Sequence, residues 1–204
     1  MTDTPDASVS PTVDRAPRPE SWVSVDVETS GPSPSLHSIL SIGAVLLDEP
    51  DREFYIELKP TTDAYTESAM VVSGLSHERL TETGVDPREA MERFEQWLKA
   101  AVPAGNVPVF AGFNAPFDWM FVADWFERFL GRNPFGHSAI DIKSYYLGFA
   151  AETWFETSMA KVSPLYLGGR DLSHNALEDA KDQAELFRHM IADSLARRRA
   201  SMPE

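Results

Sequence analysis

The sequence predicts an α/β domain in which helices pack on a mixed β-sheet. Three segments near its start, at 22–29, 39–47 and 53–58, have the length and apolar pattern of strands. Further along, segments with apolar residues at helical spacing alternate with strand-like segments. Three early strands followed by alternating helices and strands favour a mixed sheet covered by helices.

The first strand, predicted over 22–29, has two different faces. Its three valines share one face, whereas Ser24, Asp26 and Glu28 share the other. The second strand, over 39–47, is apolar enough to be central. The remaining predicted elements are strands over 53–58, 107–113 and 138–142, a short helix after the last strand, and helices over 87–101, 116–130 and 175–199. Residues 153–172 give no clear pattern.

The amino-acid composition limits the number of domains, the kinds of active site and the location of the protein. The 204 residues suit one domain, 21–199, after a proline-rich segment, 1–20, that has the composition of a disordered tail, and before a short tail, 200–204. The absence of cysteine excludes disulfides, zinc–thiolate sites and cysteine nucleophiles. No apolar run reaches the ~20 residues that span a bilayer, so we expect no membrane segment and, by default, a cytoplasmic location.

The net charge of −14 bears on partners. Contacts with phosphates need Lys and Arg, so this charge argues against a long electrostatic grip on a nucleic acid duplex. It does not exclude an enzyme that holds only a strand end, because bound divalent cations reverse the sign of the charge locally.

Asp26 and Glu28 are spaced by two on a strand, which points both carboxylates to the same side, about 7 Å apart. On an exposed strand face such a pair is ordinary. Near the centre of a sheet, their mutual repulsion calls for a cation between them.

Two helices each carry a further acid on or beside their apolar face. Asp118 lies in the middle of the apolar face of the helix at 116–130, although an acid in a first turn also suits the helix dipole. Asp179 lies on the flank of the apolar stripe of the last helix, whereas Glu178 faces away. His174 precedes that helix, where a lone histidine is most often a loop or capping residue.

Taken together, these four acids and one histidine favour a metal-dependent site. Carboxylate oxygens are the ligands that hard divalent cations prefer. Two such cations can activate a water and stabilise the leaving oxygen in a phosphoryl displacement. A histidine can take the proton of that water.

Three motifs carry a resemblance to a known family. They read VDVETSG at 25–31, FNAPFD at 113–118 and SHNALEDAKDQAELF at 173–187, with the histidine five residues before the last aspartate. In order and separation they resemble the DEDDh family of 3′→5′ exonucleases, within the RNase T and ribonuclease H-like group. The resemblance spans roughly 22–192, and the histidine favours this branch over the one with tyrosine at that position.

The resemblance implies a ribonuclease H-like fold, a mixed five-stranded sheet flanked by helices, and an enzyme that releases nucleoside 5′-monophosphates. It implies two divalent cations, Mg²⁺ or Mn²⁺, with Asp26 shared between them and His174 as the general base. The metal ligands would be Asp26, Glu28, Asp118 and Asp179. The implied partner is the 3′ end of a single-stranded DNA or RNA, with a homodimer expected by analogy only.

The resemblance also implies substrate contacts. Backbone amides of Thr29, Ser30 and Gly31 would meet the sugar of the terminal nucleotide, and Asn114 and Phe117 would shape the pocket wall. In the segment 69–80, Ser73 stands where the family usually has histidine before Gly-Ile, which puts that contact in doubt.

Some residues admit a second interpretation. Asp141 is better explained by a structural role, and Lys161 and Arg170 are candidates for phosphate contacts. Trp119 and Phe126 point off the main apolar stripe of their helix, which is typical of a subunit contact.

Two other functions stay open. One is a nucleic-acid-binding module of the same fold without turnover, although no ligand position is missing. The other is a phosphodiesterase restricted to very short oligonucleotides, which the net charge of −14 and the lack of a basic track make worth testing.

Overall fold

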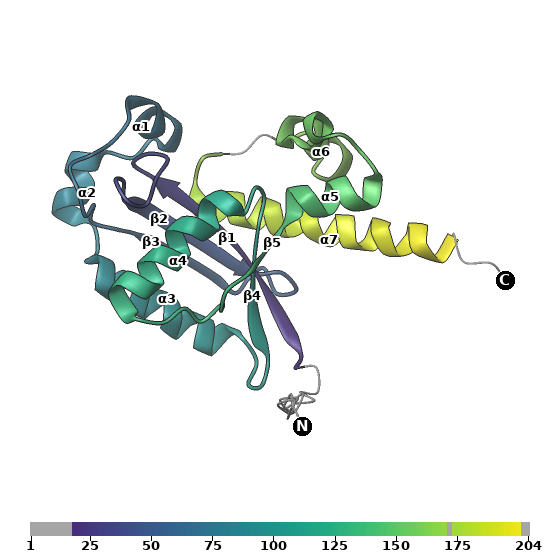
Figure 1. Ribbon diagram of the computed structural model, residues 1–204, viewed down its shortest axis with the longest axis horizontal. Coiled ribbons are helices and arrows are strands. Elements are labelled where there is room, and N and C mark those ends of the chain that lie inside the picture. The colour runs from purple at the N-terminus through teal and green to yellow at the C-terminus, as the bar shows by residue number, and fades with distance from the viewer. Residues whose placement is uncertain (1–17, 171–172, 201–204) are drawn as a thin grey trace, which may run out of the picture.

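A five-stranded sheet with the strand order β3-β2-β1-β4-β5 forms the centre of the protein (Figure 1). The computed structural model describes residues 18–170 and 173–200, so most of the tail expected at 1–20 and of that at 200–204 lies outside the described residues. The strands are β1 (Glu20–Thr29), β2 (Ile39–Leu46), β3 (Glu53–Glu57), β4 (Val107–Gly112) and β5 (Ala139–Asp141).

The strand pairing is mixed, as predicted. β1 is antiparallel to β2 and β2 is antiparallel to β3, whereas β4 is parallel to both β1 and β5. Each predicted strand is present, with boundaries that differ by one or two residues. β1 is therefore a central strand, and its side chains lie between covering layers on both faces of the sheet.

Helices cover both faces of the sheet. The helical elements are α1 (Glu67–Ser73), α2 (His77–Thr83), α3 (Pro87–Ala101), α4 (Pro116–Leu130), α5 (Ile142–Ala150), the 3₁₀ helix η1 (Trp154–Thr157), α6 (Met159–Tyr166) and α7 (Ala176–Ala200). α3 and α4 pack on one face, and α7 crosses the other face with α5 and α6 beside it (Figure 1). None of the helices in the described part of the chain is long and apolar enough to cross a membrane.

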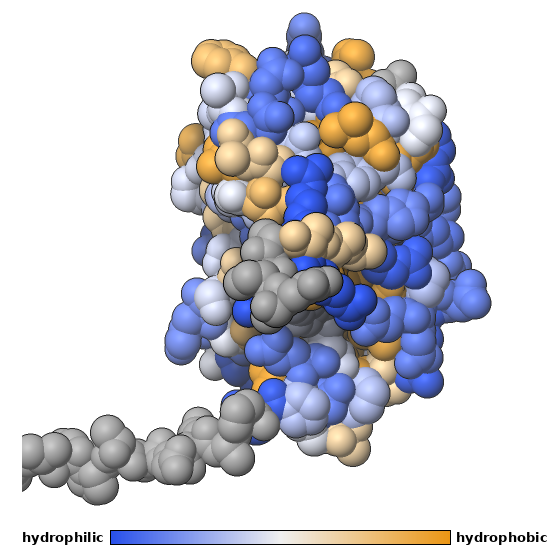
Figure 2. All heavy atoms as spheres, turned by 90° about the vertical axis from the view of Figure 1, so that its right-hand side faces the viewer, coloured by the Kyte–Doolittle hydropathy of each residue, from blue (hydrophilic) through white to orange (hydrophobic). Residues whose placement is uncertain are grey.

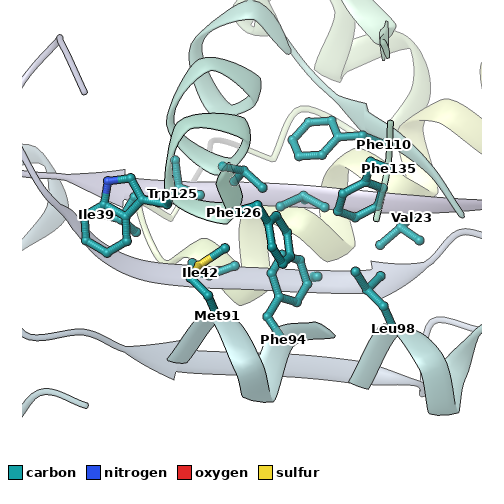
Figure 3. Packing of buried hydrophobic residues seen from close by; sticks show 14 of the residues in the cluster. Val23, Ile39, Ile42, Met91, Phe94, Leu98, Phe110, Trp125, Phe126 and Phe135 are labelled. Atoms are coloured by element: carbon teal, nitrogen blue, oxygen red, sulfur yellow. The ribbon is translucent and has the colours of Figure 1, made fainter. Parts of the chain in front are cut away.

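The core under α3 and α4 is aromatic. Phe94 stacks on Phe54 and on Phe126, with ring centroids 4.9 and 5.6 Å apart. Figure 3 shows Phe94, Phe126 and Phe135 converging between the helices and the sheet. The expectation of a subunit contact is wrong for Phe126, because α4 packs on both the sheet and α3. For Trp119, which is half-buried, it stays a prediction. Phe126 is fully buried in this core, and Trp119 packs edge-on against Phe110.

The polar face of β1 is also covered. Ser24 is completely buried, so an exposed, amphipathic strand does not explain this face. On the neighbouring strand, Gly43 is paired with Asp26. A β-carbon at Gly43 would lie 2.1 Å from the carbonyl oxygen of Ala176, so the start of α7 rests directly on the sheet at this point.

Some elements gave no usable sequence signal. α1 and α2 have seven residues each, too few to establish helical periodicity. The caps of α1 explain where it begins and ends. Thr66 accepts a hydrogen bond from Ala69 N at its start, and Gly74 ends it in the left-handed conformation. α6, within the segment that was hard to assign, contains Pro164.

The side of the molecule toward which the C-terminal end of α7 points is mainly hydrophilic. Figure 2 shows separate hydrophobic groups in its upper part, at the level of α5 and α6 in Figure 1. Three large apolar residues are exposed nearby: Trp154 and Phe155 on η1, and Leu165 on α6. Lys143 Nζ lies 3.9 Å from the centroid of the Trp154 ring.

Candidate active site

The C-terminal half of β1 supplies Asp26 and Glu28 to one side of the sheet. The register with β2 shifts between Glu28 and Thr29, and the strand ends at Thr29. Glu28 is 9% exposed, so its carboxylate lies largely out of water. Two acids are thus brought to the end of a central strand that is covered from both sides.

Asp118 joins them from the first turn of α4. It is 5% exposed, and its Oδ1 accepts a hydrogen bond from Val27 N at 3.1 Å. That donor lies between the two acids of β1. One step before α4, Ala115 N donates to Asp141 Oδ1 at 3.0 Å. Asp141 also caps α5 by accepting from Ser144 N, so it has the structural role expected for it.

Asp179 reaches the same place from the first turn of α7. Its Oδ1 accepts from Ser173 N at 2.7 Å and from Ser173 Oγ at 2.9 Å, and its Oδ2 accepts from His174 N at 3.0 Å. These bonds hold the loop in front of α7, in which His174 has a positive φ of 56° and an exposed side chain. Glu28, His174 and Asp179 each offer a ligand atom within 4.8 Å of the others.

The electrostatics show that the acids share one environment. Burial, followed by the charges of Asp118, Glu28 and Asp179, raises the pKa of Asp26 well above its usual range. Burial and the charges of Asp179 and Asp118 raise the pKa of Glu28 to about 8. Burial raises the pKa of Asp118 to about 7, against the lowering effect of its backbone hydrogen bonds.

Among the described residues, no side-chain cation forms an ion pair with these acids. The ion pairs seen within residues 18–170 and 173–200 leave out all four carboxylates. Buried carboxylates without a cationic partner either bind a proton or bind a metal ion.

A cavity of about 370 Å³ opens beside Glu28, between the end of β1 and helix α1. Its wall combines polar groups of the strand end with apolar side chains of α1 and α4. It is lined by Val27, Glu28, Thr29, Gly31, Pro32, Thr66, Ser68, Ala69, Val72 and Phe117. The volume and lining suit one small polar ligand with an apolar part.

The family follows from this site and from a match over most of the chain. A model of the RNase T family, described as exonuclease, matches residues 23–187, which contain all four acids and His174. The chain belongs to the RNase T exonuclease family. With its DEDDh motifs it is a 3′→5′ exonuclease.

Individual relatives agree with this family. The 3′-5′ DNA exonuclease Cap18 of Escherichia coli is 44% identical over 180 residues, which cover 88% of this chain and 95% of the relative. Ribonuclease T of Histophilus somni is 26% identical over 83% of this chain and 82% of its own. The nuclease domain of 3′hExo, a DEDDh family member solved bound to rAMP, is 17% identical and superposes with a TM-score of 0.70 over 85% of this chain and 92% of its own. This last likeness establishes the ribonuclease H-like fold.

Of the six residues expected to contact substrate in this exonuclease, three line the cavity and three do not. Thr29, Gly31 and Phe117 line the cavity, whereas Ser30, Ser73 and Asn114 are not among its lining residues. Ser30 Oγ donates to Ala64 O and accepts from Ser38 N, so this hydroxyl serves the loop after β1.

Ser73 lies at the end of a helix, and Asn114 lies in a turn. Ser73 is the last residue of α1 and is largely buried. Asn114 has a positive φ of 65°, and its carbonyl accepts from Phe117 N at the start of α4. α1 contributes Ser68, Ala69 and Val72 to the cavity in addition, and no sequence pattern pointed to the lining residues Thr66 and Pro32.

The two basic residues considered for phosphate contacts in this exonuclease are engaged elsewhere. Lys161 pairs with Glu156 at 3.4 Å. Arg170 Nη1 pairs with Asp182 at 2.8 Å, and its Nη2 pairs with Glu185. Any phosphate contact by either residue would therefore compete with an existing ion pair.

Proposed function

We propose that this exonuclease is a two-metal enzyme that removes nucleotides one at a time from the 3′ end of a single strand and releases nucleoside 5′-monophosphates. The observation that carries the proposal is the convergence of four carboxylates, of which Glu28, Asp118 and Asp179 are buried and Asp26 is half-buried, with no cationic side chain paired to them among the described residues. Asp26, Glu28 and Asp179 would hold one cation, and Asp118 would support a second that shares Asp26. The cations expected are Mg²⁺ or Mn²⁺.

The chain's own groups would divide the chemistry between them. Divalent cations bound here would make a water more acidic and stabilise charge on the reacting phosphate. His174, exposed at the mouth of α7 and close to Glu28, would take the proton from the attacking water. The bond from phosphorus to the 3′-oxygen of the preceding nucleotide would break, and that oxygen would take up a proton as it leaves.

The cavity beside Glu28 would receive the terminal nucleotide. Phe117 and Val72 supply apolar surface for its base or sugar, and the backbone around Thr29 to Gly31 supplies amides for its polar groups. A single nucleotide fits this enclosure better than a duplex does, which supports action on a free strand end. The relative named a DNA exonuclease supports DNA as the first substrate to test.

A second candidate substrate is a very short oligonucleotide. The net charge is −14, and Lys161 and Arg170 are held in ion pairs. Both observations favour a grip on few phosphates. Dinucleotides should then be cut as fast as longer strands.

The test is digestion of a 5′-labelled oligonucleotide with Mg²⁺ or Mn²⁺. We expect stepwise shortening from the 3′ end with nucleoside 5′-monophosphates as the product. Parallel reactions on matched DNA, RNA, an overhanging duplex and a dinucleotide identify the preferred substrate. Asp26→Asn should abolish digestion, while Asp63→Asn, which changes an exposed acid outside the cluster, should not. Equal background from wild type and Asp26→Asn would refute the proposal.

A further inference from the structure

Beyond the ligands themselves, one buried side chain connects the three segments that carry them. We propose that Gln183 is a positioning residue that fixes the Asp26 carboxylate for metal binding. The inference rests on the proposed metal centre and deepens it. It assigns no direct contact between Gln183 and metal or substrate.

Gln183 lies one helical turn after Asp179 on α7 and is 1% exposed. Its Oε1 accepts a hydrogen bond from Phe113 N at 2.8 Å. Its Nε2 donates to Asp26 Oδ1 at 2.6 Å. The side chain thus spans from the end of β4 to the middle of β1.

The orientation of this amide follows from chemistry. A backbone N–H can only donate, so the amide oxygen must face Phe113. The amide NH₂ group must then face Asp26, where it meets a carboxylate that accepts hydrogen bonds. Both polar ends of a buried amide are satisfied in this orientation, and the reverse orientation would satisfy neither.

The bond leaves Asp26 with a defined set of free lone pairs. Oδ1 gives one lone pair to the amide and keeps another, while Oδ2 keeps both. A donor at 2.6 Å also restricts rotation of the carboxylate. Among the four acids, Asp26 is the one we expect to share two cations, so its orientation affects both.

The other end of Gln183 holds the connection between β4 and α4. Phe113 directly precedes Asn114, whose positive φ turns the chain into α4, and α4 carries Asp118. Since Gln183 itself follows Asp179 on α7, its side chain links the segments of Asp26, Asp118 and Asp179. A change in its length or polarity should therefore loosen the centre as a unit.

A purely structural role makes a different prediction. If Gln183 only filled space, replacing it by a residue of similar size would lower the melting temperature and leave the metal affinity of the folded protein unchanged. Gln183→Met keeps the shape and removes both hydrogen bonds. Gln183→Asn keeps a buried amide but is one methylene too short to span both partners.

The experiment is calorimetric titration of Mn²⁺ into the full chain, wild type and variants, with thermal denaturation as a check of folding. We expect Gln183→Met and Gln183→Asn to weaken Mn²⁺ binding by roughly 10–100-fold, the range found for residues that orient metal ligands. Gln96→Met, which changes the chain's other glutamine on an exposed face of α3, should bind as wild type does.

Wild-type affinity in a folded Gln183 variant would overturn the inference, as would a wild type that binds no Mn²⁺. If the Met variant does not fold, the Asn variant gives the same comparison. The titration contains no nucleic acid, so it tests the role of Gln183 separately from the proposed nuclease activity. A wild type that binds Mn²⁺ but digests no strand would refute the proposed activity and leave the role of Gln183 standing.

Discussion

Gly43 on β2 lies against Ala176 at the start of α7 so closely that a β-carbon at position 43 would lie 2.1 Å from the Ala176 carbonyl oxygen. Gly43 is also the β2 partner of Asp26. The helix that carries Asp179 therefore rests on the sheet beside the first acid. Because Gly43 has no side chain, α7 can lie close enough to the sheet to bring Asp179 near the acids of β1.

Gly43→Ala should accordingly impair both stability and activity. The added methyl group forces α7 away from β2, at a cost of about 1–3 kcal/mol in the free energy of unfolding. Asp179 and His174 would move with the helix, so Mn²⁺ affinity and kcat should fall together. Gly148→Ala is the matched control, because nothing lies within 4 Å of its added β-carbon on α5. Equal behaviour of the two variants would contradict this role of Gly43.

Metal-free protein should lose stability as pH rises. The pKa of Glu28 is raised from 4.5 to about 8 and that of Asp118 from 3.8 to about 7. Between about pH 4 and pH 8 the folded state thus binds more protons than the unfolded state, and the free energy of unfolding falls with pH by at most about 1.4 kcal/mol per pH unit for each such group.

Denaturation curves measured with a chelator from pH 5 to pH 8.5 check this expectation. Glu28→Gln should flatten the pH dependence, because the amide does not titrate. Added Mn²⁺ should restore stability most at the higher pH, where the carboxylates are charged. A wild-type stability that rises over this interval would contradict the electrostatic description of the site.

Val72 should contribute to substrate binding and not to chemistry. It lines the cavity and is 48% exposed, whereas its neighbour Val71 is 82% exposed and is not among the lining residues. Val72→Ala should raise KM for an oligonucleotide by roughly 3–10-fold with kcat little changed, because about 1 kcal/mol of apolar contact is lost. Steady-state kinetics on Val71→Ala provide the comparison, and an equal KM in both variants would exclude the cavity as the nucleotide site.

His174 should affect turnover far more than metal binding. As a general base it would contribute roughly 100-fold to 10,000-fold, so His174→Ala should lower kcat by that order. The carboxylates remain, and Mn²⁺ titration should give an affinity close to wild type. His137→Ala, at an exposed histidine before β5, is the control. Loss of Mn²⁺ binding in His174→Ala would make this residue a ligand and not the base.

Much of the fold could be predicted because its signals are local. The alternation of β1 and the apolar stripe of α7 are properties of short stretches of sequence. The same local reasoning failed at Phe126, because α4 packs against α3 as well as the sheet and so buries a second stripe. α1 was missed, since seven residues do not establish a period.

The site divides in the same way. Asp118 and Asp179 were recognisable as acids on or beside apolar helix faces. The bond between Gln183 and Asp26 joins residues 157 positions apart, and it depends on how α7 lies across β1. Gly43 carried no signal either, because a glycine in a strand does not reveal which backbone approaches it.

The most direct measurement is the anomalous diffraction of crystals of the full chain grown with Mn²⁺. We expect one Mn²⁺ in bonding contact with Asp26, Glu28 and Asp179, and a second Mn²⁺ shared by Asp26 on the side of Asp118. Mn²⁺ bound elsewhere, or absent from these carboxylates under conditions in which the protein degrades DNA, would contradict this expectation.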